Sequence, residues 1–289
     1  MHKCKENLTN NAVFCDLHTH THFSDGSLSP RELIELAESE GLGAIALTDH
    51  NTIGGVPAFL EAAEGRCITA IPGIEFSTDF EGRELHILAL GFKPEAYSRI
   101  NAVVDELTKR KRLAIEGLID DLICAGYKLD RVRIHEGAHG IVNRAHVATE
   151  LVRGGYAASR SDAFDRILYS GGPFYRSPKY IDTVECVDFV RSIGAVSVLA
   201  HPFLNIDEAR IRALLGRLRG KLDAIEVLYS EYDEQTTAAS YSLAREFGLH
   251  PSGGSDFHGK NKPDISLGRG KGKLEIPLSF AADMGLLGG

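Results

Sequence analysis

Three histidines stand on alternating positions in residues 16–26, DLHTHTHFSDG, which also contain two aspartates. Residues two apart on an extended chain point to the same side, so His18 and His20 can hold one metal ion together. His22 follows at the same spacing but approaches a turn at residues 24–26, which makes it a weaker candidate. Imidazole and carboxylate ligands suit zinc, manganese or iron in a hydrolytic site. The five cysteines form no C-x-x-C pair, which argues against a thiolate zinc site.

Further histidines and carboxylates follow other predicted strands. In a barrel of parallel strands the carboxyl ends of the strands share one face, and chemistry is found there. We therefore expect these polar groups to converge with His18 and His20. They are TDH at residues 48–50 after strand 44–47, Glu75 after strand 68–74, His201 after strand 195–200, and SDFH at 255–258 after strand 250–254.

Length and composition indicate an ordinary globular protein. At 289 residues, 43% hydrophobic and 25% charged, the chain fits one barrel-sized domain or a domain with an insertion. Its apolar runs fall short of the roughly 20 residues that span a membrane, and the N-terminus has no apolar signal region, so we expect a cytoplasmic protein. The net charge of −8 disfavours long nucleic acids but is compatible with a small anionic substrate.

Short apolar runs alternate with helix-like segments, which favours a parallel α/β architecture. Ser29 and Pro30 read as the start of a helix over residues 31–40, with a stop at Gly41. Between residues 96 and 182 the pattern changes to charged amphipathic helices. The predicted division is a first barrel part at 12–95, an inserted helical subdomain that caps the substrate at 96–182, and a second barrel part at 183–289.

The motifs together resemble those of the polymerase and histidinol phosphatase (PHP) family: DLHTH at 16–20, SDG at 24–26, TDH at 48–50, GIE at 73–75, AHP at 200–202 and GSDFH at 254–258. The resemblance implies a distorted (β/α)7 TIM-like barrel and three divalent metal ions, Mn, Zn or Fe. By this resemblance the first ion is held by His18, His20, Glu75 and Asp256, the second by Glu75, His86 and His201, and the third by Asp25, His50 and His258. Asp49 would orient His50, and Asn51 stands where many members have a second aspartate.

The insertion contains NRAH at residues 143–146, which resembles a segment of the PHP subgroup that acts on nucleoside 3′,5′-bisphosphates and short RNA. Arg144 would clamp phosphate, because a guanidinium can meet two oxygens at once, and Arg176 and Lys179 are further phosphate candidates. His146 would bind phosphate or protonate the leaving oxygen, and with Asp256 it is a candidate catalytic residue. The implied reaction is phosphoester hydrolysis of a small nucleotide by a metal-bridging hydroxide.

Other readings stay open from the sequence. A related metal barrel could hydrolyse a C–N bond, or the chain could be a non-catalytic metal-dependent binding module. Arg144 could form a surface salt bridge, His146 could cap its helix, and Arg176 and Lys179 could be surface charges. Glu226 and Tyr229 could face the barrel interior or have a structural role. The native metal, and the choice between phosphatase and exonuclease activity, are not determined by these motifs.

Overall fold

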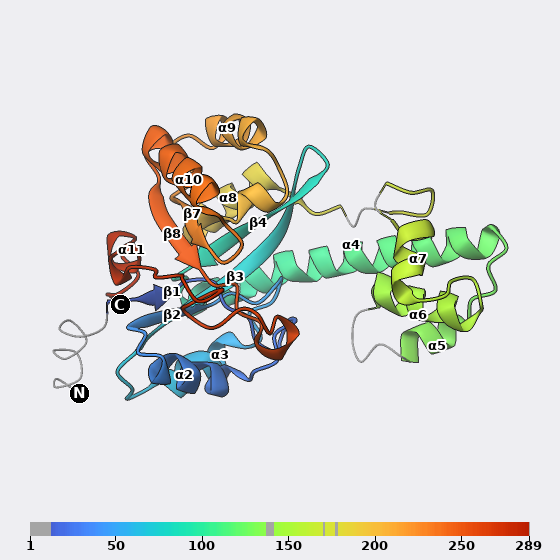
Figure 1. Ribbon diagram of the computed structural model, residues 1–289, viewed down its shortest axis with the longest axis horizontal. Coiled ribbons are helices and arrows are strands. Elements are labelled where there is room, and N and C mark those ends of the chain that lie inside the picture. The colour runs from blue at the N-terminus through green and yellow to red at the C-terminus, as the bar shows by residue number, and fades with distance from the viewer. Residues whose placement is uncertain (1–12, 137–141, 170, 177–178, 289) are drawn as a thin grey trace. The chain divides into compact units, whose positions relative to one another are not determined.

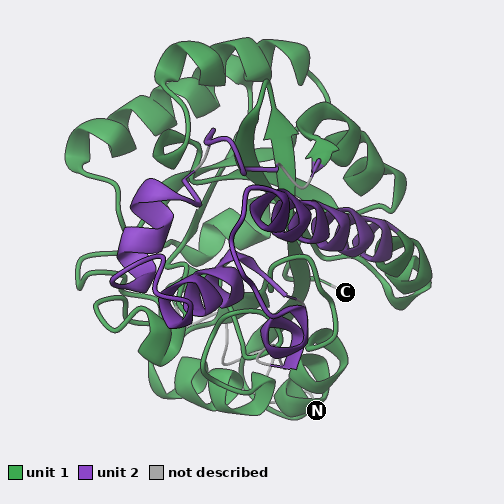
Figure 2. Cartoon of the chain, turned by 90° about the vertical axis from the view of Figure 1, so that its right-hand side faces the viewer, with its two compact units in different colours: residues 1–102, 181–289 green, residues 103–180 purple. Residues whose placement is uncertain are grey.

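The computed structural model describes residues 13–136, 142–169, 171–176 and 179–288. The chain divides into two compact units, one formed by residues 1–102 and 181–289 and the other by residues 103–180 (Figure 2). The second unit falls within the predicted insertion at 96–182, while residue 12, the predicted start of the barrel, lies outside the described residues. Each unit is described below by itself.

A twisted, barrel-like sheet forms the centre of the first unit, with helices around it (Figure 1). Seven strands follow one another in the order β1-β2-β3-β4-β6-β7-β8, and β5 pairs with β3. This arrangement is the TIM-like α/β barrel that the sequence predicted. The strands are β1 Cys15–Asp16, β2 Ala44–Leu47, β3 Thr69–Phe80, β4 Arg83–Leu90, β5 Ile181–Asp182, β6 Val196–Ala200, β7 Ala224–Tyr229 and β8 His250–Gly254.

The two ends of this sheet meet beside the first strand. The Leu17 N–H donates to Gly253 O at 3.2 Å, and the Asp256 N–H donates to His18 O at 2.9 Å. Thr19 and Phe257 form a parallel bridge next to them. These contacts nearly close the barrel and bring the chain after β8 against the histidines that follow β1.

The sheet departs from an all-parallel order at β4, which runs antiparallel to both β3 and β6. A tight turn at Glu81 and Gly82, with φ of 53° and 78°, joins β3 to β4. Positive φ at both turn residues is the geometry that two-residue hairpins favour. The hairpin extends β3 to Phe80, beyond the predicted strand 68–74, so Glu75 lies in mid-strand and not at a strand end.

Helix α2, Pro30–Ser39, shows how the sequence sets a helix boundary. The Ser29 side chain accepts from the Glu32 N–H while the Glu32 carboxylate accepts from the Ser29 N–H, a capping box, and Pro30 occupies the first turn. Leu33, Ile34 and Ala37 form its buried face. The other helices of this unit are α3 Val56–Ala63, α8 Thr183–Ser192, α9 Glu208–Arg217, α10 Glu234–Phe247 and α11 Leu278–Asp283, with short 3₁₀ turns η1 Pro94–Ala96, η2 Pro202–Leu204 and η3 Gly259–Asn261.

The second unit is helical and has its own core. It contains most of α4, Tyr97–Cys124, with α5 Arg131–Glu136, α6 Arg144–Arg153 and α7 Arg160–Arg166. Fully buried Leu122, Val147 and Leu151 belong to one apolar cluster in this unit. Among the described residues, none of the helices is both long and apolar enough to cross a membrane.

Candidate metal centre

The structure brings all nine predicted ligand residues together at one end of the barrel. Each follows or lies within a strand of the first unit, and together they form four overlapping groups whose ligand atoms lie within 4.8 Å of one another. The groups are His20, Asp25, His50 and His258; His18, His20 and Asp256; His18, Glu75 and His201; and His50, Glu75 and His86.

Glu75 lies at the centre of the cluster. It is fully buried in β3, where the carboxylate points toward the histidines that follow the neighbouring strands. The antiparallel hairpin places His86 of β4 within the same cluster. Five imidazole nitrogens lie between 2.7 and 3.3 Å from the carboxylate oxygens: His18 Nε2, His20 Nε2 and His50 Nδ1 at Oε2, and His86 Nδ1 and His201 Nε2 at Oε1.

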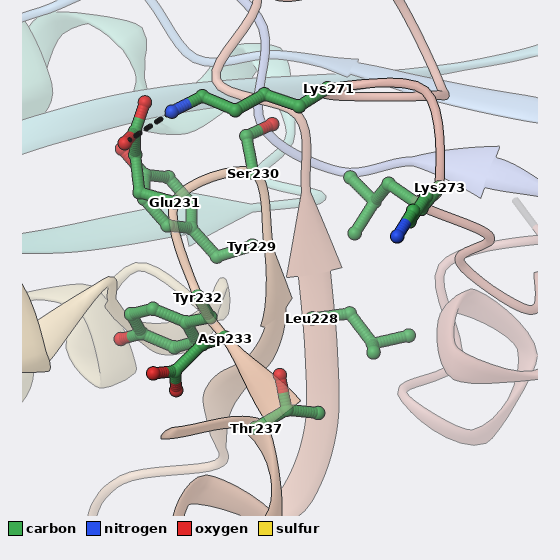
Figure 3. Close-up of a pocket in the computed structure, with 10 residues that line it drawn as sticks. Leu228, Tyr229, Ser230, Glu231, Tyr232, Asp233, Thr237, Lys271 and Lys273 are labelled. Atoms are coloured by element: carbon green, nitrogen blue, oxygen red, sulfur yellow. Dashed lines mark hydrogen bonds and ion pairs between the residues drawn. The ribbon is translucent and has the colours of Figure 1, made fainter. Parts of the chain in front are cut away.

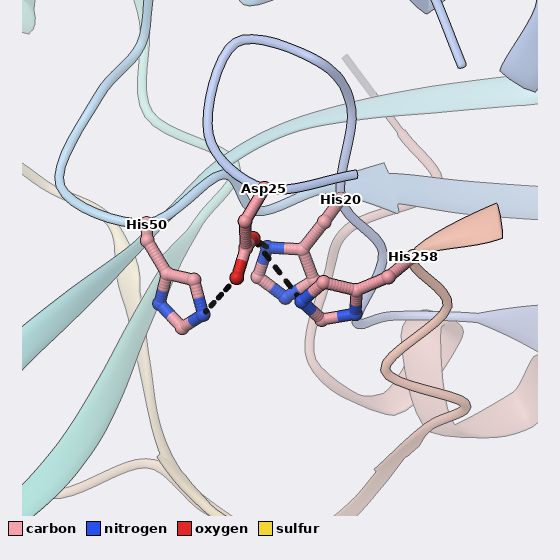
Figure 4. Close-up of side chains that lie close together, drawn as sticks. All are labelled: His20, Asp25, His50 and His258. Carbon is pink, nitrogen blue, oxygen red and sulfur yellow. Dashed lines mark ion pairs between the residues drawn. The ribbon is translucent and has the colours of Figure 1, made fainter. Parts of the chain in front are cut away.

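Asp25 and Asp256 complete the cluster from two loops. Asp256 Oδ1 lies 3.1 Å from His20 Nε2 and 3.7 Å from His18 Nε2. Asp25 Oδ1 lies 3.1 Å from His258 Nε2. Figure 4 shows the carboxylate of Asp25 between the rings of His50, His20 and His258. The Asp25 side chain is 57% exposed, so this side of the cluster faces solvent.

The backbone around the cluster is tightly constrained. A Cβ added to Gly254 would lie 2.1 Å from His18 Cβ, so only glycine permits β8 to approach the first histidine this closely. His201 and Asp256 have φ of 28° and 56°, a region that non-glycine residues rarely adopt. Such conformations persist where the surroundings over-determine them, which is typical of functional sites.

The protonation states of three of these residues suit the binding of a cation. Burial lowers the pKa of His20 to about 3, which keeps this imidazole neutral and its nitrogens available. Burial would raise the pKa of Glu75, but His50, His18 and His86 beside it hold that pKa well below its usual range. Burial likewise opposes ionisation of Asp256, while the adjacent His20 imidazole and the charge of His18 keep its pKa well below the usual value. Both carboxylates are therefore anionic and suited to bind a cation.

Several buried polar atoms at the cluster make no hydrogen bond. Most are nitrogens that point toward a carboxylate without hydrogen-bond geometry. Each buried polar atom without a partner costs on the order of 1–3 kcal/mol, and a cation between imidazole and carboxylate would satisfy them together. The donor set therefore fits divalent metal ions. The atoms are His18 Nε2, His20 Nδ1 and Nε2, Glu75 Oε2, His86 Nδ1 and His201 Nδ1.

A second set of residues orients the ligands. Glu226 of β7 is fully buried, with Oε1 3.0 Å from His18 Nδ1 and Oε2 accepting from the His201 N–H at 2.7 Å. A carboxylate on the outer nitrogen of a ligating histidine is the common arrangement at metal sites. The alternation of strand 224–229 indicated that Glu226 could face inward, but the sequence did not pair it with His18.

Asp49 has a different role from the one expected. Its carboxylate accepts hydrogen bonds from the Thr21 N–H, the Thr21 hydroxyl and the Ser24 hydroxyl, at 2.6–2.7 Å. It therefore fixes the loop that carries Asp25, whereas we expected it to orient His50. Asn51 pairs with Ser77, donating to its hydroxyl and accepting from its N–H, and so ties the turn after His50 to β3.

Two residues near Asp256 were not assigned a role by the motifs. The Tyr229 hydroxyl donates to Asp256 Oδ2 at 2.9 Å, and the Lys262 ammonium donates to the same oxygen at 2.7 Å. Tyr229 also borders a cavity of about 430 Å³ that is lined by residues 228–233, Thr237 and the turn at residues 271–274 (Figure 3). In this cavity the Lys271 ammonium pairs with Glu231 at 2.7 Å. No sequence motif distinguishes Lys262 from other surface lysines.

The predicted substrate residues lie in the second unit. The Arg144 guanidinium stacks over Tyr175 and Phe164, with Cζ 5.1 and 5.6 Å from the ring centres, and donates to the carbonyl oxygen of residue 168 at 3.2 Å. Asn143 donates its N–H to His146 Nδ1 at 3.1 Å, so this ring helps to cap α6.

Arg176 and Lys179 differ in their contacts. Arg176 forms a two-pronged ion pair with Asp121, at 2.7 and 2.8 Å, and that carboxylate occupies the face of the guanidinium that would meet phosphate. Lys179 has a φ of 47°, and its carbonyl accepts from Arg110 at 3.3 Å. The exposed ion pair of Arg176 agrees with the surface-charge alternative that the sequence left open.

An α/β barrel with imidazole and carboxylate side chains gathered at one end is the arrangement typical of metal-dependent hydrolases. Residues 16–148 match the PHP domain. The chain is 34% identical to the 5′-3′ exoribonuclease Rnm of Salmonella typhimurium over 93% of this chain and 92% of that protein. The chain therefore belongs to the PHP family and is a hydrolase of phosphoester bonds.

Two further comparisons agree with this placement. A 3′,5′-nucleoside bisphosphate phosphatase of Chromobacterium violaceum is 28% identical over 88% of this chain and 90% of its own length. A crystal structure from Bifidobacterium adolescentis, assigned as a metal-dependent phosphoesterase, superposes with a TM-score of 0.72 and 26% identity, covering 93% of this chain and 94% of that one. The similarity thus extends over the insertion as well as the barrel.

Proposed function

We propose that this protein hydrolyses the phosphate esters of small nucleotides with divalent metal ions held at the barrel end. The observation that carries the proposal is the buried Glu75 carboxylate with five imidazole nitrogens 2.7–3.3 Å from its oxygens. Relatives that act on a nucleoside bisphosphate or on RNA support the nucleotide class. The substrate is then a nucleoside 3′,5′-bisphosphate, a nucleoside monophosphate or a short RNA.

We assign the ligands to three ions, with manganese, zinc or iron as the metal. His18, His20, Glu75 and Asp256 would hold the first, Glu75, His86 and His201 the second, and Asp25, His50 and His258 the third. Glu75 is shared between two ligand groups, one with His18 and His201 and the other with His50 and His86, which supports a carboxylate that serves two ions. Bound divalent ions would lower the pKa of a water molecule and offset charge on the phosphoryl oxygens.

The residues of the chain have separate tasks in this proposal. Asp256 would hold an ion beside the reacting phosphate of the substrate, and Glu226 keeps His18 oriented. Arg144 binds phosphate with the guanidinium nitrogens that its carbonyl partner at residue 168 leaves available. Because the Asn143 N–H donates to His146 Nδ1, a neutral His146 carries its proton on Nε2 and can donate a hydrogen bond from it to a phosphate oxygen. To protonate a leaving oxygen the ring would have to be the imidazolium, which gives up the hydrogen bond from Asn143.

The inserted helical segment at 96–182 is proposed to cap the substrate, with the barrel parts at 12–95 and 183–289 holding the metals. Lys179 would add positive charge for phosphate, and Arg176 would do so only by exchanging its Asp121 partner. The cytoplasmic location and the exclusion of long nucleic acid stay predictions from composition.

A substrate panel tests the proposal. Manganese-loaded protein is assayed for phosphate release from nucleoside 5′-monophosphates, nucleoside 3′,5′-bisphosphates and histidinol phosphate and for nucleotide release from short RNA, with a His18→Ala, Asp256→Ala variant as control. Turnover of one or more nucleotides or of RNA, lost in the variant, is the expected result. Metal-loaded protein that releases neither phosphate from a nucleotide nor nucleotides from RNA would instead favour C–N hydrolysis or a binding role.

A further inference from the structure

Lys262 places a positive charge directly at the cluster of candidate ligand side chains. It follows η3 in the loop after β8, and its Nζ lies 2.7 Å from Asp256 Oδ2. Its side chain is 42% exposed, whereas that of Asp256 is 8% exposed. The ammonium therefore touches the buried ligand from the solvent side of the cluster.

The two oxygens of Asp256 have different neighbours. Oδ1 faces the imidazoles, at 3.1 Å from His20 Nε2 and 3.5 Å from His258 Nδ1. Oδ2 accepts from two donors, the buried Tyr229 hydroxyl at 2.9 Å and the Lys262 ammonium. Two donors on one oxygen fix the carboxylate so that only Oδ1 is free to meet an ion.

A neutral hydroxyl is sufficient for that positioning, so the ammonium needs a separate explanation. A lysine paired with a metal-ligating carboxylate reduces the negative charge that the carboxylate offers to the ion, and its own positive charge repels the ion. Both effects weaken metal binding. An anion bound beside the metals offsets this cost. Lys262 has three N–H donors, and Asp256 accepts one of them, which leaves donors directed toward solvent at the cluster.

We propose that Lys262 binds a phosphate oxygen of the substrate at the metal centre, while Tyr229 alone is sufficient to position Asp256. The inference rests on the proposed phosphoesterase function and names one of its substrate contacts. Lysine is suited to this task because its ammonium meets a phosphate oxygen as a point charge without fixed geometry. The contact recognises the phosphate group and not the nucleoside.

Two variants that each remove one hydrogen bond from Asp256 Oδ2 separate the roles. Lys262→Met removes the charge and keeps the chain length, and Tyr229→Phe removes only a neutral donor. Both are measured for inhibition by inorganic phosphate, KM and kcat with the best nucleotide, bound manganese and melting temperature. We expect Lys262→Met to raise the Ki of phosphate and the KM about tenfold, and Tyr229→Phe to change the Ki less than about twofold. Lys262→Arg, which keeps the charge, should restore most of the phosphate affinity.

The outcomes distinguish this inference from the proposed function. If the wild-type protein hydrolyses nucleotides and phosphate inhibits Lys262→Met and Tyr229→Phe with the same Ki, Lys262 only positions Asp256 and the inference is wrong. An unchanged Ki in a folded, metal-loaded Lys262→Met protein has the same meaning. A wild-type protein without phosphoesterase activity would overturn the proposed function, and the Kd of inorganic phosphate, measured by calorimetry on the metal-loaded wild-type protein and both variants, would still test the contact.

Discussion

At the scale of residues, Glu75 contacts more of the other candidate ligands than its sequence motif indicates. Its sequence context, GIE after an apolar run, marks only one carboxylate near a strand end. In the fold its two oxygens meet imidazoles from four different parts of the barrel. A change at this residue therefore affects every group of ligands that contains it.

Glu75→Gln is predicted to abolish metal retention at the centre. The amide cannot supply the negative charge that the neighbouring imidazoles and ions require, and its NH₂ group would face histidine nitrogens. Activity should fall by more than the roughly 10–100-fold typical of residues that only orient ligands. Metal content by mass spectrometry and phosphate release measure the effect. Glu81→Gln, in the exposed β3–β4 turn, is the matched control, and equal metal content in both variants would contradict the assignment.

Glu226→Gln should have a smaller effect of a different kind. The amide keeps the shape and can still accept the His201 N–H, but it no longer balances charge at His18 Nδ1. We expect a loss of about 10–100-fold in metal affinity or activity with the fold retained. Titration of the metal-stripped protein with Mn²⁺ measures it, with the exposed Glu231→Gln as control. Wild-type affinity in Glu226→Gln would show that the carboxylate is not needed to orient the ligand.

At the scale of elements, the antiparallel β4 explains both a success and an error of the sequence analysis. The alternation of apolar runs and helices correctly predicted a barrel, and β2 has the predicted bounds. Hydrophobic periodicity carries no information on strand direction, so the hairpin at residues 81–82 was not foreseen. His86 reaches the cluster because β4 runs antiparallel to β6, so that His86 pairs with Ala200 at the carboxyl end of β6.

The candidate site, like the fold, was predictable in part: the ligand residues were predictable, and the residues that orient them were not. Residue types and motif order located all nine candidate ligands, because they follow or lie in strands whose ends meet. The partners that orient them depend on side-chain contacts between distant segments, such as Glu226 with His18, 208 positions apart. Lys262 could not be found because a single lysine in a polar loop has no distinguishing pattern.

Gly254→Ala is predicted to damage β8 and the cluster together. The added Cβ would lie 2.1 Å from His18 Cβ and 2.8 Å from the His18 nitrogen, so strand and histidine must separate. We expect a loss of stability of about 3 kcal/mol or more and weaker metal binding, seen in urea unfolding and metal content. Gly216→Ala in α9 meets no atom within 4 Å and should stabilise by about 0.5–1 kcal/mol. A Gly254→Ala protein as stable as wild type would contradict the predicted contact.

At the scale of the whole molecule, the helical unit has its own ion pair between a buried glutamate and a half-exposed arginine, with a predictable dependence on pH. Glu150 is 5% exposed and accepts from Arg133 at 2.8 Å. The hydrogen bond from Arg133 holds the pKa of Glu150 below its usual value. The unfolded chain therefore binds more protons than the folded chain near the ordinary glutamate pKa of about 4.3. The stabilisation is present above that pH and is lost as the pH falls through the lower folded value.

Glu150→Gln should lower the urea midpoint at pH 7 and reduce its dependence on pH between 6 and 3. The expected cost at pH 7 is about 2 kcal/mol, since a charged hydrogen bond in a buried position is lost. Circular dichroism across urea at several pH values measures it. The exposed Glu136→Gln in α5 serves as control. An unchanged pH slope in Glu150→Gln would show that this carboxylate does not carry the dependence.

A manganese titration of metal-stripped protein is the most direct test of the proposed phosphoesterase, with phosphate release from adenosine 3′,5′-bisphosphate and 5′-monophosphate and nucleotide release from short RNA followed at each step. We expect activity to be absent without metal, to rise with bound manganese to a plateau at three ions per chain, and to stay absent in Glu75→Gln. Full metal binding with no product released from any of the three substrates, or equal release without metal, would contradict this function.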